Sequence, residues 1–128
     1  MDVAKSIITI VAIFSSLLSF SQGEWNNWYF GKKAGVTFNS GNPVALTDGA
    51  NNYGYNCASI SDSLGNLLFY TDGSKVYKRN HAQMINGSNL LPGGNDAQGP
   101  LILQLPGNKD IYYIITVSFA HENLSLIP

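Results

Sequence analysis

Hydrophobic and polar residues alternate along this chain in short runs, which Gly, Asn, Asp and Pro interrupt about every 8–12 residues. Runs of this length are typical of β-strands joined by tight turns, and no stretch combines helical periodicity with helix caps. The pattern predicts an all-β fold. Its expected strands are Trp28–Phe30, Val36–Asn39, Val44–Leu46, Ala58–Ser61, Leu67–Thr71, Lys75–Lys78, Leu101–Leu105 and Ile111–Val117.

Two hairpins are expected, one turning at Gly65 and the other at Gly107, because glycine adopts the positive φ of such turns at little cost. The two turns are about 42 residues apart, and a period of about 40–50 residues in β-rich sequence is typical of propeller blades. The strands that follow, 67–71 and 111–117, are apolar on both faces, as strands covered on both sides are. We therefore predict a partial β-propeller of about two to three antiparallel blades, with a β-sandwich as the alternative.

The first 21 residues have the features of a secretory signal peptide. Lys5 precedes the apolar run Ile7–Leu18, and a small-x-small tripeptide ends at Ser21. Cleavage between Ser21 and Gln22 would leave about 107 residues. The apolar run is too short to cross a bilayer comfortably, which disfavours a membrane anchor. We expect an exported protein with no stable membrane span after cleavage.

The amino-acid composition excludes several classes of protein and of site. The chain has 7 Lys+Arg, 8 Asp+Glu and a net charge of −1, without a basic patch, so nucleic acid is not an expected partner. One cysteine, Cys57, excludes a disulfide framework and a cysteine-based zinc site. No His or Lys adjoins Cys57 to activate it, so we expect a small buried strand residue rather than a reactive thiol.

Three segments carry a resemblance to a known family. They are residues 28–50 (WYFGKKAGVTFNSGNPVALTDGA), 57–73 (CASISDSLGNLLFYTDG) and 76–87, with VYKRNH and MING. Together they resemble the N-terminal region of large surface proteins of gliding bacteria that use type IX secretion. The resemblance implies an export signal, a β-propeller-like N-terminal region, often PKD repeats, and a C-terminal sorting domain. Loops 51–56 and 91–96 depart from the usual family sequence.

The expected domain organisation follows from blade size. A propeller needs about four to eight blades, and residues 22–128 provide two to three at the observed period. We expect these residues to be an incomplete, N-terminal part of a propeller-like domain, and the chain to be a fragment of a longer protein. The sorting domain is absent, so a chain that ended at Pro128 would be periplasmic rather than at the cell surface.

Aromatic residues are the main candidates for ligand binding. Trp25 belongs to an aromatic cluster, and Tyr53 and Tyr55 flank a Gly-Asn loop. Exposed aromatic rings stack on sugar rings, and neighbouring Asn and Asp side chains form hydrogen bonds with the sugar hydroxyl groups. The alternative is that Trp28 and Phe30 form core and that Trp25 fastens a loop, because large aromatic side chains mostly serve burial.

Two carboxylates and two histidines are the candidate metal ligands of this sequence. Asp48 and Asp72 each occur in Thr-Asp-Gly and are weak calcium candidates. Without an Asp-x-Asp-x-Asp pattern, a role in turns is favoured for both. His81 and His121 lack paired ligand spacing, and His81 is predicted to be a surface or loop residue. We expect no cofactor, calcium being the one candidate.

No catalytic motif is present. We therefore expect an exported, non-enzymatic binding or scaffold module of a cell-surface or secreted bacterial protein, acting in adhesion or in binding glycan or protein. One alternative is a fragment of an exported propeller enzyme acting on carbohydrate, which would need a pair of carboxylates across a groove. The other is a small β-sandwich that binds carbohydrate.

Overall fold

The chain forms an all-β structure, as predicted. The computed structural model describes residues 23–52, 56–90, 99–117 and 124–127, so the expected signal peptide and the Ser21–Gln22 cleavage site lie outside the described residues. The described part contains one 3₁₀ turn, η1 (Gly23–Trp25), and no α-helix. The strands are β1 (Asn27–Tyr29), β2 (Gly35–Thr37), β3 (Val44–Leu46), β4 (Ala58–Ser61), β5 (Leu67–Thr71), β6 (Val76–Lys78), β7 (Leu101–Gln104), β8 (Tyr112–Val117) and β9 (Leu124–Ile127).

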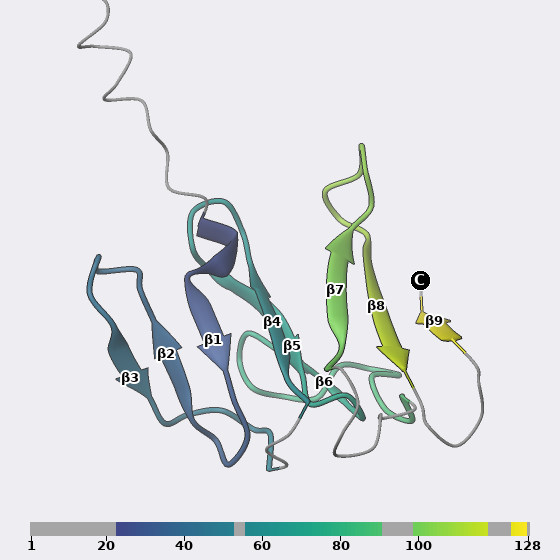
Figure 1. Ribbon diagram of the computed structural model, residues 1–128, viewed down its shortest axis with the longest axis horizontal. Helices are drawn as coiled ribbons and strands as arrows, with labels where there is room; N and C mark the ends of the chain where they lie inside the picture. Colours follow the sequence, from purple (N-terminus) through teal and green to yellow (C-terminus); the bar gives the residue numbers. More distant parts are fainter. Residues whose placement is uncertain (1–22, 53–55, 91–98, 118–123, 128) are drawn as a thin grey trace, which may run out of the picture.

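These strands form three antiparallel sheets of three strands each, which follow one another in chain order (Figure 1). We name them sheet A (β1–β3), sheet B (β4–β6) and sheet C (β7–β9). In each sheet the strands are neighbours in the order in which they occur in the chain. The first strands of successive sheets lie next to one another, β1 against β4 and β4 against β7.

All eight predicted strands are present, with ends that differ by at most two residues. β9, Leu124–Ile127, is a strand that the sequence pattern did not predict. The two hairpin turns are confirmed, since Gly65 and Gly107 have φ of 84° and 79°. Asp62 caps the first turn: one carboxylate oxygen accepts the backbone N–H groups of Leu64 and Asn66, each at 2.9 Å.

Sheet B is covered on both faces. Phe69 of β5 belongs to an apolar cluster that sheet C completes with Ile102 and Ile114. The next residue, Tyr70, points to the opposite face and packs with Tyr29 of sheet A. The prediction of two covered faces is therefore correct for β5. For β8 the prediction of two covered faces is wrong on the face that points away from sheet B, where Val117 is exposed.

The turn at Gly65 is fastened to sheet A by asparagine side chains. The carbonyl oxygen of Gly65 accepts hydrogen bonds from the amides of Asn27, at 2.7 Å, and Asn39, at 2.9 Å. The amide of Asn26 in turn donates to Asn39 Oδ1 at 2.9 Å. Asn27 also donates to the buried hydroxyl of Ser61 in β4. These bonds fix how sheet A sits on sheet B.

Candidate functional site

Four large aromatic side chains are exposed on and beside sheet A. The Trp28 ring makes edge contacts with Phe30 and Phe38, with centroids 6.5 Å and 5.8 Å apart. The indole N–H of Trp28 donates to the carbonyl oxygen of Trp25 at 2.7 Å, which fixes η1 beside the sheet. Trp25 is 58% exposed and Trp28 is 47% exposed. We call Trp25, Trp28, Phe30 and Phe38 the aromatic surface.

The alternative that Trp28 and Phe30 are core is wrong. Neighbouring residues of a strand point to opposite faces, and in β1 it is Asn27 and Tyr29 that are buried against sheet B. Trp28 and Phe30 therefore point away from sheet B. Since residues 28–30 are all aromatic, hydrophobicity alone did not show which of them would be buried.

A hollow of about 290 Å³ lies beside the aromatic surface. Trp25, Trp28 and Phe30 line one side of it, and Leu101 of β7 lines another. Ser59 of β4 also lines the hollow, but its hydroxyl donates to the carbonyl oxygen of Asn27 at 2.7 Å. The hollow therefore offers mainly ring faces and aliphatic groups to a ligand.

Only one of the three aromatic residues proposed to contact a ligand is among the residues that the structure describes. Trp25 lies on η1 with its side chain largely in solvent. Tyr53 and Tyr55 lie outside the described residues. The aromatic surface therefore includes Trp25 and, unexpectedly, Phe38, which the sequence did not single out.

The calcium candidates have separate partners. Asp72 is buried, and its Oδ1 accepts hydrogen bonds from the backbone N–H groups of Ser74 and Lys75 at 3.0 Å and 2.8 Å. Its Oδ2 accepts the hydroxyl of Tyr77 at 3.0 Å. Asp72 thus builds the turn after β5, as favoured, whereas Asp48 pairs with His81. Within the described ranges, no group of three His, Cys, Asp or Glu side chains is placed to hold a metal ion.

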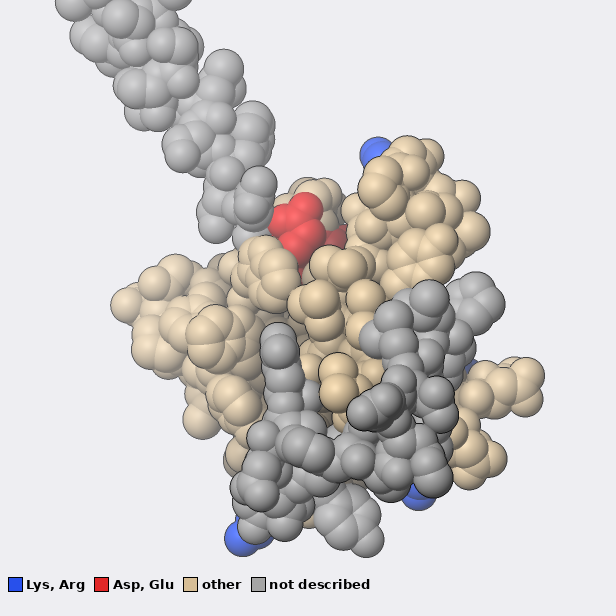
Figure 2. Space-filling model, turned by 45° about the vertical axis from the view of Figure 1, so that its right-hand side comes forward, with Lys and Arg blue, Asp and Glu red and all other residues tan. Residues whose placement is uncertain are grey.

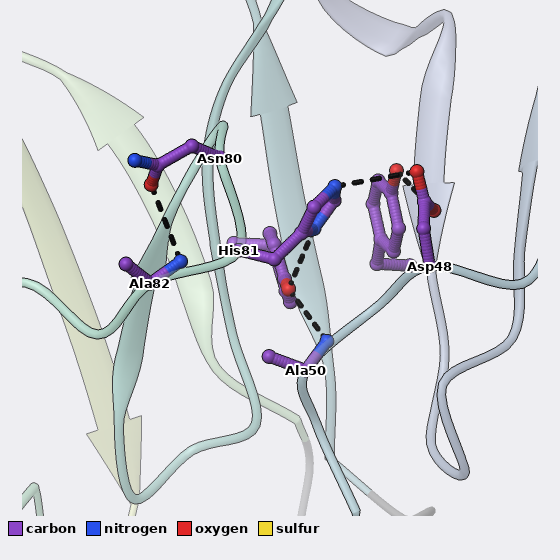
Figure 3. A network of polar contacts seen from close by, with 7 residues as sticks. Asp48, Ala50, Asn80, His81 and Ala82 are labelled. Atoms are coloured by element: carbon purple, nitrogen blue, oxygen red, sulfur yellow. Dashed lines mark hydrogen bonds and ion pairs between the residues drawn. The ribbon is translucent and has the colours of Figure 1, made fainter.

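Asp48, His81 and Tyr70 form a chain of polar contacts that joins sheets A and B (Figure 3). The Tyr70 oxygen accepts the backbone N–H of Ala50 at 2.8 Å and lies 3.1 Å from His81 Nδ1. The Tyr70 hydroxyl donates to Nδ1 when the His81 ring carries its hydrogen on Nε2. That nitrogen lies 3.3 Å from Asp48 Oδ2. We call these three side chains the Asp–His–Tyr clamp.

His81 is held in the clamp by its own turn. Its backbone N–H donates to the carbonyl oxygen of Lys78 at 2.8 Å, and the side chain of Asn80 accepts the N–H of Ala82 at 3.2 Å. The turn gives His81 a φ of 64°, uncommon for a residue with a side chain. His81 is a loop residue as predicted, but its side chain is only 25% exposed. Since both ring nitrogens have partners, the clamp holds the sheets together rather than presenting a free base.

Tyr70 of the clamp is also the middle ring of a stack of three tyrosine rings. Tyr29 stacks on Tyr70 with centroids 4.6 Å apart, and Tyr70 stacks on Tyr77 at 5.2 Å. The hydroxyl of Tyr29 donates to Asp48 Oδ1 at 3.1 Å. Burial, chiefly, raises the pKa of Tyr77 to about 12 and also raises the pKa values of Tyr29 and Tyr70. Nearby carboxylates add to each shift.

We expect alkaline unfolding driven by this tyrosine stack. The unfolded chain releases these protons near pH 10, whereas the folded chain keeps them, so stability is complete below about pH 10 and is lost as the pH rises toward about 12. Absorbance at 295 nm and circular dichroism should be recorded together. Tyr29, Tyr70 and Tyr77 should ionise only as β-structure disappears. Ionisation of all seven tyrosines by about pH 11, one unit above their ordinary pKa, with the β-signal intact would contradict this expectation.

Cys57 lies one residue before β4 and is half-buried. The side-chain amide of Asn51 donates to its sulfur at 3.3 Å. Burial, as the main cause, raises the pKa of the Cys57 thiol. The raised pKa agrees with the expectation of an unreactive thiol, because the thiolate is the nucleophile.

The charged residues form no extended patch on the face seen in Figure 2. Acidic side chains gather in one place, while Lys and Arg lie apart at its edges. Asp110, Asp62 and Glu24 act together on Tyr112, whose pKa is raised first by burial and then by these carboxylates.

Comparison with known proteins found no match: no family model, no curated protein and no solved structure is similar to this chain. In the described part of the chain, no helix has the length and apolar character needed to cross a membrane.

Proposed function

We propose that this chain is an exported, non-enzymatic binding and scaffold module of a bacterial cell-surface or secreted protein, built as part of a β-propeller. The covering of sheet B supports the propeller over the sandwich. In a two-sheet sandwich each sheet is covered on one face, whereas sheet B packs against sheet A through Tyr70 and against sheet C through Phe69. Blades of a propeller are covered in this way.

The cellular context of the proposal comes from the sequence. The signal-peptide features of residues 1–21 support export. The resemblance of segments 28–50, 57–73 and 76–87 to surface proteins of gliding bacteria supports a place in a type IX secreted protein. In that setting the module acts in adhesion, through contacts that its surface makes outside the cell.

The observation that carries the binding function is the aromatic surface. Trp25 and Trp28, both about half-exposed or more, lie together beside the hollow of about 290 Å³. Exposed indole rings offer flat apolar faces with a polar edge, which suit the apolar faces of sugar rings. We therefore propose glycan as the ligand, with Trp25 as the main contact residue.

The chain provides its own reporter for this test. It contains two tryptophans, and both belong to the aromatic surface. The exported protein should be titrated with soluble neutral polysaccharides while tryptophan emission is recorded. We expect a blue shift on binding and at least tenfold weaker binding after Trp25→Ala. Leu64→Ala, at an 83% exposed turn position, is the matched control and should bind as the original protein does.

The same titration distinguishes glycan binding from the alternative that the chain is part of a carbohydrate-active propeller enzyme. The carboxylates of Asp48 and Asp72 have partners in the clamp and in a turn, so neither is proposed as a catalytic carboxylate. Reducing ends should stay constant while polysaccharide is bound. An increase in reducing ends would favour the propeller enzyme, and the absence of any emission change across the polysaccharides would contradict glycan binding.

A further inference from the structure

The three buried rings of the tyrosine stack each have a proton acceptor of their own. The stack consists of Tyr29, Tyr70 and Tyr77. The Tyr29 hydroxyl donates to Asp48 Oδ1 at 3.1 Å, and the Tyr77 hydroxyl donates to Asp72 Oδ2 at 3.0 Å. The third acceptor is His81 Nδ1, 3.1 Å from the Tyr70 oxygen. A buried hydroxyl needs a partner, for which a backbone carbonyl would serve. Here all three partners are side chains that can take up a proton.

The central pair, Tyr70 and His81, is arranged for proton transfer from the phenol to the imidazole. His81 Nε2 lies 3.3 Å from Asp48 Oδ2 (Figure 3). A carboxylate can only accept, so a hydrogen bond here places a hydrogen on Nε2 and leaves Nδ1 of the neutral ring as the acceptor for Tyr70. A proton that moves to Nδ1 gives an imidazolium paired with Asp48. The backbone N–H of Ala50 remains on the Tyr70 oxygen, at 2.8 Å.

This arrangement suits the removal of one electron from the stack. A phenol that loses an electron becomes a strong acid and gives up its hydroxyl proton. Without an acceptor, the product in a buried site is a radical cation, and an isolated buried charge is costly. Each hydroxyl of the stack has an acceptor at 3.0–3.1 Å, so the product is a neutral phenoxyl radical. The ring contacts of 4.6 Å and 5.2 Å allow the rings to exchange the unpaired electron.

We propose that the tyrosine stack is a one-electron redox site, which reduces oxidising radicals that reach the aromatic surface. This inference goes beyond the proposed function. Trp28 is about half-exposed and directly precedes Tyr29 in β1. A radical oxidant, such as the azide radical, takes one electron from the Trp28 indole and becomes an anion. The indole radical cation then takes one electron from the stack, and the Tyr70 proton moves to His81 Nδ1.

The unpaired electron settles on Tyr70, because imidazole is a stronger base than the carboxylates that serve the other two rings. One electron from a reductant of the ascorbate class converts the phenoxyl radical back to phenol. The proton then returns from His81 Nδ1 to the Tyr70 oxygen. The cycle leaves the protein unchanged, with one radical oxidant reduced and one electron taken from the reductant.

The test is oxidation of the exported protein by azide radical in pulse radiolysis, with the absorption bands of tryptophan and tyrosyl radicals recorded over time. We expect the tryptophan band to decay as the tyrosyl band rises, at a rate independent of protein concentration. His81→Asn should slow this transfer at least tenfold. Asparagine tolerates the φ of 64° and can accept a hydrogen bond from Tyr70, but its amide does not take up the proton. A purely structural role of His81 would leave the transfer rate of this variant unchanged.

Two further measurements complete the test. Tyr113→Phe is the matched control, because Tyr113 in β8 lies outside the stack, and it should leave the transfer rate unchanged. In deuterium oxide the original protein should transfer the electron more slowly, since the proton moves with it. Circular dichroism checks that each variant keeps its β-structure. Equal transfer rates in the original and His81→Asn proteins would overturn the proposal. Decay of the tryptophan band without a tyrosyl band would do the same.

Discussion

We expect Gly65→Ala to lower the free energy of unfolding by about 2–4 kcal/mol, from backbone strain together with lost hydrogen bonds. Gly65 has a φ of 84°, which costs a residue with a Cβ about 1–2 kcal/mol. A Cβ would lie 2.2 Å from Asn39 Oδ1 and 2.9 Å from Asn26 Nδ2. Both amides must move, which disturbs the bond from Asn39 to the Gly65 carbonyl and the bond between Asn26 and Asn39, while the Asn27 bond to that carbonyl has no such clash.

Gly107→Ala is the matched control for this prediction. Gly107 has a φ of 79° in the equivalent turn of sheet C, but a Cβ there would have no atom within 4 Å. It should therefore cost only the strain of about 1–2 kcal/mol. Urea denaturation of both variants measures the difference. Equal midpoints would mean that the asparagine contacts of Gly65 contribute nothing to stability.

The local turns of this fold were predictable, and the contacts between sheets were not. Gly65 and Asp62 are close in sequence, and turn chemistry depends on such neighbours. Asn27 and Asn39 bond to Gly65 from 38 and 26 residues away, and their partner depends on how sheet A lies on sheet B. A sequence rich in asparagine indicates turns, and it does not show which asparagines cross between sheets.

In the candidate site, too, local features were predictable from the sequence, and contacts between distant residues were not. Trp25 was recognised as a candidate for binding, because its type and neighbours suggest exposure. His81 was assigned to a loop, which is correct, but its partners Asp48 and Tyr70 are 33 and 11 residues away. No spacing rule links three residues that meet only when the loop after β3 reaches the turn after β6.

We expect Tyr70→Phe to cost about 1–3 kcal/mol of stability, the penalty for leaving buried polar groups without a partner. Tyr70 has 0% exposure, and its hydroxyl is hydrogen-bonded both to the backbone N–H of Ala50 and to Nδ1 of His81. Phenylalanine keeps the ring in the stack and removes both bonds. Tyr112→Phe is the control: it removes only an exposed bond from Gln104, and should stay within about 0.5 kcal/mol.

A double-mutant cycle with His81→Gly separates the clamp from general packing. Glycine tolerates the φ of 64° at this position and removes the imidazole, so backbone strain falls while the clamp is lost. If Tyr70 and His81 act through their shared bond, the two changes should be non-additive by about 0.5–1.5 kcal/mol. Additive effects would mean that Tyr70 stabilises the chain only through Ala50 and the ring stack. Tyr70 lies on β5 and His81 in the turn after β6, so this coupling energy measures a bond within the sheet B side of the clamp, and the contacts to the segment after β3 are made by Asp48 and Ala50.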